Sequence, residues 1–80
     1  MSEIVVKKIR KFLLGHKASL LNNLSDDKLL WIYENISKGA TLSETARRII
    51  TDWLPESRSK FKTLISDLAA FKIDLLKPEE

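Results

Sequence analysis

The chain has 80 residues, of which 44% are apolar, with no cysteine, two glycines and two prolines. This composition excludes a disulfide framework and a thiolate metal site, argues against disorder and against a many-stranded sandwich, and predicts one folded domain over residues 1–80. The net charge of +3 is unevenly spread, since residues 1–24 carry five Lys or Arg against one acidic residue and residues 41–64 carry five against three. Such basic segments indicate a polyanion as one partner, although the net charge is also ordinary for a small domain.

No stretch approaches the ~20 apolar residues of a membrane helix. The start MSEIVVKK is interrupted by charges and does not fit a signal peptide. We therefore expect a cytoplasmic protein with no membrane association.

The first segment predicts a helix that ends near Gly15. Its apolar residues recur at helical spacing, and they are Ile4, Val5, Ile9, Phe12 and Leu13. The β-branched residues 4–6 are compatible with a strand, but no second strand offers to pair with them. Residues 16–24 are compatible with one short helical turn or two, and whether Gly15 divides one helix or separates two stays open.

A second clear helix begins after Ser25, which is a favourable N-cap. Asp26 and Asp27 follow it and suit the positive end of the helix dipole. The helix closes at Lys38 and Gly39. Its buried face is predicted to contain Leu29, Leu30, Ile32, Tyr33 and Ile36.

Thr41 and Glu44 have the spacing of a capping box, in which the Thr41 hydroxyl accepts from the Glu44 amide and the Glu44 side chain reaches back to the Thr41 amide. The helix that follows runs towards Pro55, which ends it or begins the next one. We expect the last helix to extend from about Glu56 to Leu76. The predicted fold is therefore all-α, a compact bundle or orthogonal array of four to five short helices.

Catalytic and metal-binding patterns are absent from the sequence. His16 is the single histidine and has no identifiable partner, and the adjacent Asp26 and Asp27 would point about 100° apart on a helix. There is no glycine-rich phosphate loop and no zinc-ligand spacing. We expect a binding protein rather than an enzyme, without a cofactor.

Two stretches carry a resemblance to a known family: GATLSETARRI at residues 39–49 and PESRSKFKTLI at residues 55–65. They resemble the helix-turn-helix DNA-binding domains of small phage and plasmid regulators. Ala46 matches the small residue at which the two helices of that family cross. The family spacing requires about five additional residues in the turn, a lengthened connection that lets Phe61 and Leu64 take the two apolar positions of the second helix.

The resemblance implies a regulator that reads DNA with the helix beginning near Glu56. It implies that Arg47 and Arg48 contact the DNA backbone, that backbone amides at Ser57 hold a phosphate, and that an exposed stripe of the last helix faces the groove. That stripe consists of Arg58, Ser59, Lys62, Thr63 and Ser66. A second phosphate-binding patch is predicted on the first helix, at Lys7, Arg10 and Lys11. The alternative is that all these residues form solvated faces of amphipathic helices.

The run LLWIY at residues 29–33 places more large side chains in sequence than one helix face can hold. Its excess apolar surface predicts either burial on two faces or a partner, and favours a homodimer. The alternative function is therefore a helical protein–protein interaction module, an adaptor or inhibitor that binds its partner around Trp31 and Tyr33. DNA binding would weaken steeply with salt, whereas binding through Trp31 would respond little.

Overall fold

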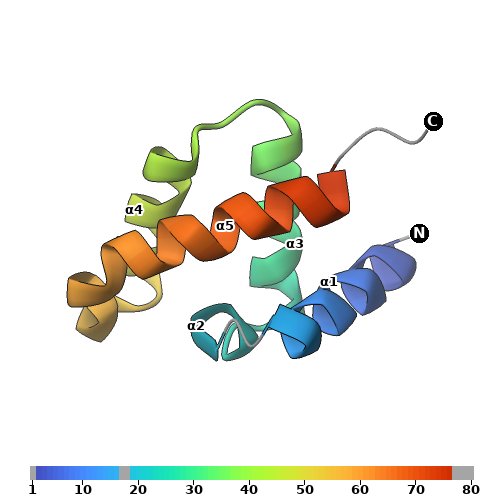
Figure 1. The fold of residues 1–80 in the computed structure, drawn as a ribbon, viewed down its shortest axis with the longest axis horizontal. Helices are drawn as coiled ribbons and strands as arrows, with labels where there is room; N and C mark the ends of the chain where they lie inside the picture. The colour runs from blue at the N-terminus through green and yellow to red at the C-terminus, as the bar shows by residue number, and fades with distance from the viewer. Residues whose placement is uncertain (1, 17–18, 77–80) are drawn as a thin grey trace.

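A computed structural model describes residues 2–16 and 19–76 of the chain. These residues form five α-helices and one 3-10 segment, with no strand among them, so the predicted all-α class is confirmed (Figure 1). The elements are α1 (Ser2–His16), α2 (Ser19–Asn22), α3 (Asp26–Ser37), α4 (Leu42–Asp52), η1 (Pro55–Lys60) and α5 (Phe61–Leu76). The helix α1 continues through Gly15, and α2 is the short turn expected within residues 16–24.

The two predicted N-caps are present. Ser25 Oγ accepts from the Lys28 amide at 3.4 Å, and Thr41 Oγ1 accepts from the Glu44 amide at 3.1 Å. The second half of the capping box differs from the prediction, because the Glu44 carboxylate accepts a hydrogen bond from the Thr41 hydroxyl at 3.0 Å instead of from the backbone amide. A single threonine oxygen thus both donates and accepts at the start of α4.

The turn from α3 to α4 depends on Gly39, as the sequence indicates. Gly39 has a φ of +99°. Its amide donates to the carbonyl of Ile36 at 3.0 Å, and the Ala40 amide donates to the carbonyl of Asn35 at 3.1 Å. This pair of bonds is the Schellman motif, which satisfies the last carbonyls of α3 and requires a residue that tolerates positive φ.

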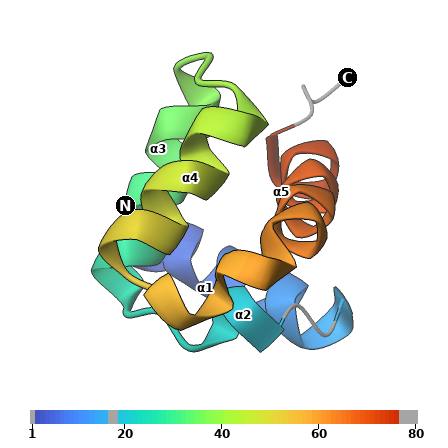
Figure 2. The same ribbon diagram turned by 90° about the vertical axis from the view of Figure 1, so that its left-hand side faces the viewer.

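The core lies between α5 and the other helices. Figure 1 shows α5 running across the molecule, with α4 near its first half and α1 near its second half. Phe71 is fully buried and contacts Phe12 and Tyr33 edge-to-face, with ring centroids 5.7 Å and 6.5 Å apart. Figure 2 shows α3 and α4 side by side, with α5 facing them. Because α5 packs against α4, η1 and α1, and Phe71 also contacts Tyr33 of α3, its apolar stripe forms the centre of the core.

The prediction that the last helix begins near Glu56 is wrong. Residues 55–60 form the 3-10 segment η1, which has a kink at Ser57 (φ −101°, ψ 18°), and the α-helix begins at Phe61. Pro55 lacks an amide hydrogen, and the Ser57 amide donates to the carbonyl of Leu54 at 2.9 Å in the tighter i to i−3 pattern. Serine side chains also compete for backbone hydrogen bonds and weaken the continuation of an α-helix here.

The connection between α4 and α5 therefore covers residues 53–60, which is longer than the three- to four-residue turn of a helix-turn-helix. Ala46 is fully buried on α4, which packs extensively against α5. Leu64 is buried and Phe61 packs against the core.

Candidate nucleic-acid interface

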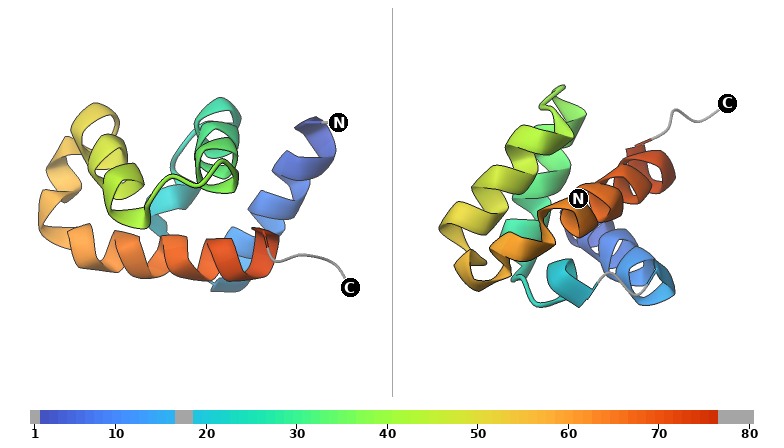
Figure 3. Two further views of the ribbon diagram at one scale, coloured as in Figure 1. Left: turned by 90° about the horizontal axis from the view of Figure 1, so that it is seen from above. Right: turned by 60° about the vertical axis from the view of Figure 1, so that its left-hand side comes forward.

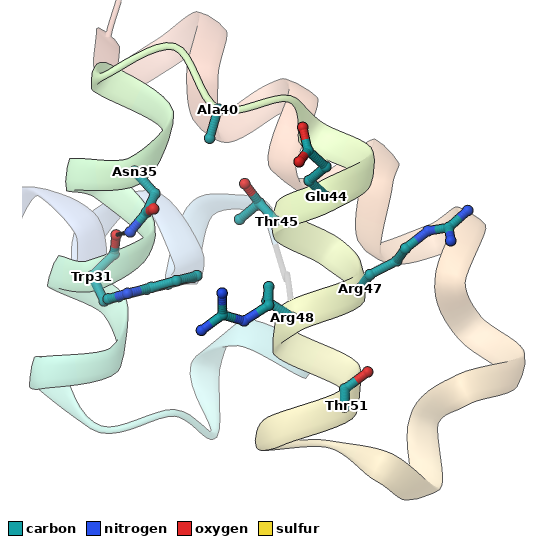
Figure 4. A pocket seen from close by; sticks show the side chains of 8 residues that line it. All are labelled: Trp31, Asn35, Ala40, Glu44, Thr45, Arg47, Arg48 and Thr51. Atoms are coloured by element: carbon teal, nitrogen blue, oxygen red, sulfur yellow. Dashed lines mark hydrogen bonds between the residues drawn. The ribbon is translucent and has the colours of Figure 1, made fainter.

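The outward face of α4 carries the two arginines singled out in the sequence. Four residues of α4 are buried, namely Thr45, Ala46, Ile49 and Ile50. Arg47, Arg48 and Thr51 are exposed on the remaining surface. Consecutive helix residues point about 100° apart, so the two arginines project from different sides of α4. Figure 4 shows Arg48 directed towards α3 and Arg47 directed away from it.

Arg48 is engaged by its neighbours. Its guanidinium carbon lies 5.6 Å from the centroid of the Trp31 ring, and its Nε atom lies 3.3 Å from Oδ2 of Asp52. It borders a concavity of about 360 Å³ between α3 and α4 (Figure 4). The lining residues are Trp31, Asn35, Ala40, Glu44, Thr45, Arg47, Arg48 and Thr51. This lining combines two arginines with the Glu44 carboxylate, which repels an anion.

Arg47 has a different environment. Its guanidinium carbon lies 5.9 Å from the centroid of the Phe61 ring, and within the described ranges it forms no hydrogen bond or ion pair. It lines a second concavity, of about 390 Å³, which we call the two-arginine concavity. Its lining residues are Arg47, Ile50, Thr51, Arg58 and Phe61. These residues include no acid, and they come from three successive elements: α4, η1 and α5.

The predicted recognition stripe is exposed but does not lie on one helix. Arg58 and Ser59 are exposed on η1, whereas Lys62, Thr63 and Ser66 are exposed on α5. Ser57 is half-buried at the kink, and its own amide is bonded to the carbonyl of Leu54. The expectation that this amide holds a phosphate at a helix start is therefore wrong, because Ser57 does not begin an α-helix and its amide is occupied.

The phosphate-binding patch predicted at Lys7, Arg10 and Lys11 lies on α1, away from the exposed arginines of α4. Figure 3 shows α1 and α4 towards opposite ends of the molecule. The Arg10 guanidinium bonds the carbonyls of Asn22 and Leu24 and the carboxylate of Asp26, so its donors are used within the fold. Lys7 and Lys11 are exposed, but Lys7 borders a concavity that is also lined by acidic residues.

Trp31 and Tyr33, the residues proposed for a protein partner, do not share a groove. The Trp31 ring contacts Trp53 edge-to-face with centroids 5.1 Å apart, whereas Tyr33 contacts Phe71. Both are partly buried, on different sides of α3. The most exposed large apolar side chains lie elsewhere: Ile4 (65%), Leu14 (75%) and Ile73 (64%).

The sequence did not single out Ile50, Thr51 or Phe61 as parts of a site. Ile50 and Phe61 fall on regular apolar stripes, and a stripe indicates the core. They lie beside Arg58 because of the course that η1 takes between α4 and α5, and no periodic sequence pattern predicts that course. The side chain of His16 lies outside the described residues, so its predicted lack of a role stays a prediction. Among the described residues no three His, Cys, Asp or Glu side chains gather as a metal site would require.

Comparison with known proteins gives no relative: no protein-family model, curated protein or solved structure matches the chain. In the described part of the chain, no helix combines the length and the apolar character needed to cross a bilayer.

Proposed function

We propose that this protein binds nucleic acid through the surface formed by α4, η1 and the start of α5. The observation that carries the proposal is that Arg47 and Arg58, from two separate elements, line one concavity that contains no acidic side chain among its described residues. A guanidinium presents several donors in a plane and binds phosphate oxygens in pairs. Lys62 and Thr63 are exposed at the start of α5, directly after Phe61, and add a third cation and a hydroxyl.

The proposal keeps DNA as the target and changes the mode of contact expected from the resemblance. The exposed cations lie on α4 and η1 as well as on α5, so phosphate contacts from several elements replace base reading by one long helix. We also propose that the protein acts as a regulator and that it binds DNA as a homodimer. The rival protein-interaction function has less support, since Trp31 and Tyr33 pack on different sides of α3.

The test is fluorescence anisotropy of a labelled DNA of mixed sequence, titrated with the protein at low and at moderate salt. Binding by phosphate contacts is expected to weaken about tenfold or more between the two conditions. Arg58→Ala and Arg47→Ala should each weaken binding, whereas Lys72→Ala removes a charge from the second half of α5 and should have little effect. Analytical sedimentation of the same samples measures whether the protein binds DNA as a homodimer. The absence of binding by the unmodified protein at low salt would refute the proposal.

A further inference from the structure

We infer that the two-arginine concavity receives one unstacked nucleotide of a single strand, with its base against Phe61 and its phosphate between Arg47 and Arg58. This inference rests on the proposed nucleic-acid binding and names the form of nucleic acid that fits. It follows from the apolar floor of the concavity and from its charged rim.

The floor is apolar and has an aromatic face. Phe61 is half-buried at the first position of α5, and Ile50 lies beside it in the lining. The Arg47 guanidinium, a planar cation, lies over the Phe61 ring, 5.9 Å from its centroid, and both groups line the concavity. Nucleic-acid bases stack on aromatic side chains and on guanidinium planes, and this site supplies both.

The rim carries the charge. Arg47 belongs to α4 and Arg58 to η1, and both border the concavity together with the hydroxyl-bearing Thr51. An anion between the two guanidinium groups would interact with both and would have no acidic side chain beside it among the described lining residues. A charged rim above an apolar floor matches a nucleotide, which joins a phosphate to a planar base.

The apolar floor of the concavity separates this ligand from an isolated phosphate and from an intact duplex. A duplex keeps its base faces stacked inside the helix and presents phosphates and groove edges. A duplex would therefore contact the arginines but leave Phe61 and Ile50 without a partner, whereas a single strand supplies base faces.

The neighbouring concavity beside Trp31 does not meet these conditions, although it also has an aromatic ring and two arginines, Arg47 and Arg48. Arg48 is paired there with Asp52, and Glu44 lines the same space. The lack of an acidic side chain among the described lining residues thus distinguishes the two-arginine concavity.

The test compares three probes on the full chain: a fluorescein-labelled oligothymidylate, a blunt labelled duplex of equal length, and thymidine monophosphate as a competitor. Phe61→Leu keeps an apolar side chain but removes the aromatic face. It should weaken binding of the oligothymidylate roughly tenfold and leave duplex binding nearly unchanged. Phe12→Leu is the matched control, because it makes the same change at a core ring on α1. Thermal unfolding of both variants establishes that each is folded.

Tighter binding of the single strand than of the duplex, lost in Phe61→Leu and kept in Phe12→Leu, is the expected result. Equal binding of strand and duplex, with no effect of Phe61→Leu, would overturn the inference and leave the proposed function standing. Competition by the monophosphate at the same concentration as the oligonucleotide would also overturn it, since the ligand would then be a free nucleotide. Failure of both labelled probes to bind would refute the proposed function itself.

Discussion

The Arg10 guanidinium of α1 lies 2.8 Å from the Asp26 carboxylate at the start of α3. The same group donates to the carbonyl of Asn22 at 3.1 Å and to the carbonyl of Leu24 at 2.9 Å. Arg10 therefore fixes the chain between α2 and α3 against α1. One arginine satisfies two backbone carbonyls of a connection that has little regular structure of its own.

Replacing Arg10 by Ala is expected to lower the free energy of unfolding by about 1–2 kcal/mol. The ion pair is partly solvent-exposed and contributes little, so most of the loss comes from the bonds to the two carbonyls. Urea unfolding followed by tryptophan fluorescence measures the change. Lys11→Ala removes a neighbouring exposed charge and should stay within about 0.5 kcal/mol. Equal effects of the two substitutions would show that Arg10 has no special structural role.

The two glycines are expected to respond in opposite directions to alanine. Gly39 has positive φ, so Gly39→Ala should destabilise the protein by about 1 kcal/mol through backbone strain, since no atom lies within 4 Å of the added carbon. Gly15 is helical and equally free of close neighbours, so Gly15→Ala should stabilise by roughly 0.5–1 kcal/mol. Thermal melts of the pair under one set of conditions test both signs. A loss of stability in Gly15→Ala would contradict the helical assignment there.

Removal of the Thr41 cap is expected to cost about 1 kcal/mol in Thr41→Ala. The hydroxyl accepts from the Glu44 amide and donates to the Glu44 carboxylate, and alanine loses both bonds. Thr41→Ser retains them and should be nearly neutral. Ser43→Ala, in the first turn of α4, is the control for a general effect of substitution at this helix end. Chemical denaturation of the three variants provides the comparison.

Arg47 and Arg48 are adjacent in sequence but should give different phenotypes. Arg47→Ala is expected to weaken nucleic-acid binding several-fold with little effect on stability, because its guanidinium has no ion pair in the described chain. Arg48→Ala removes the cation over Trp31 and the pair with Asp52, so it should change tryptophan fluorescence and affect binding less. Anisotropy and emission spectra of both variants measure this. Identical binding losses would mean that both arginines contact the ligand.

The sequence by itself determined the helical class, the caps at Ser25 and Thr41 and the closing glycine at residue 39. These features depend on local rules: residues three or four apart share a helix face, and a cap bonds an amide within the next turn. The burial of Leu29, Ile32 and Ile36 also followed from periodicity. Local rules suffice to predict these features because the interacting groups lie within about one helical turn of each other.

Only the tertiary structure decided which cationic side chains are bonded within the fold and which of them line a common concavity. Arg10 has the same sequence features as a surface cation, yet α1 brings it against Asp26. Ser57 matches a helix start, yet Pro55 and the tighter bonding of η1 move that start to Phe61. Arg58 joins Arg47 and Phe61 because η1 bends back beside α4. These relationships depend on contacts between elements, whose geometry is set by packing of the whole core rather than by the spacing of residues along the chain.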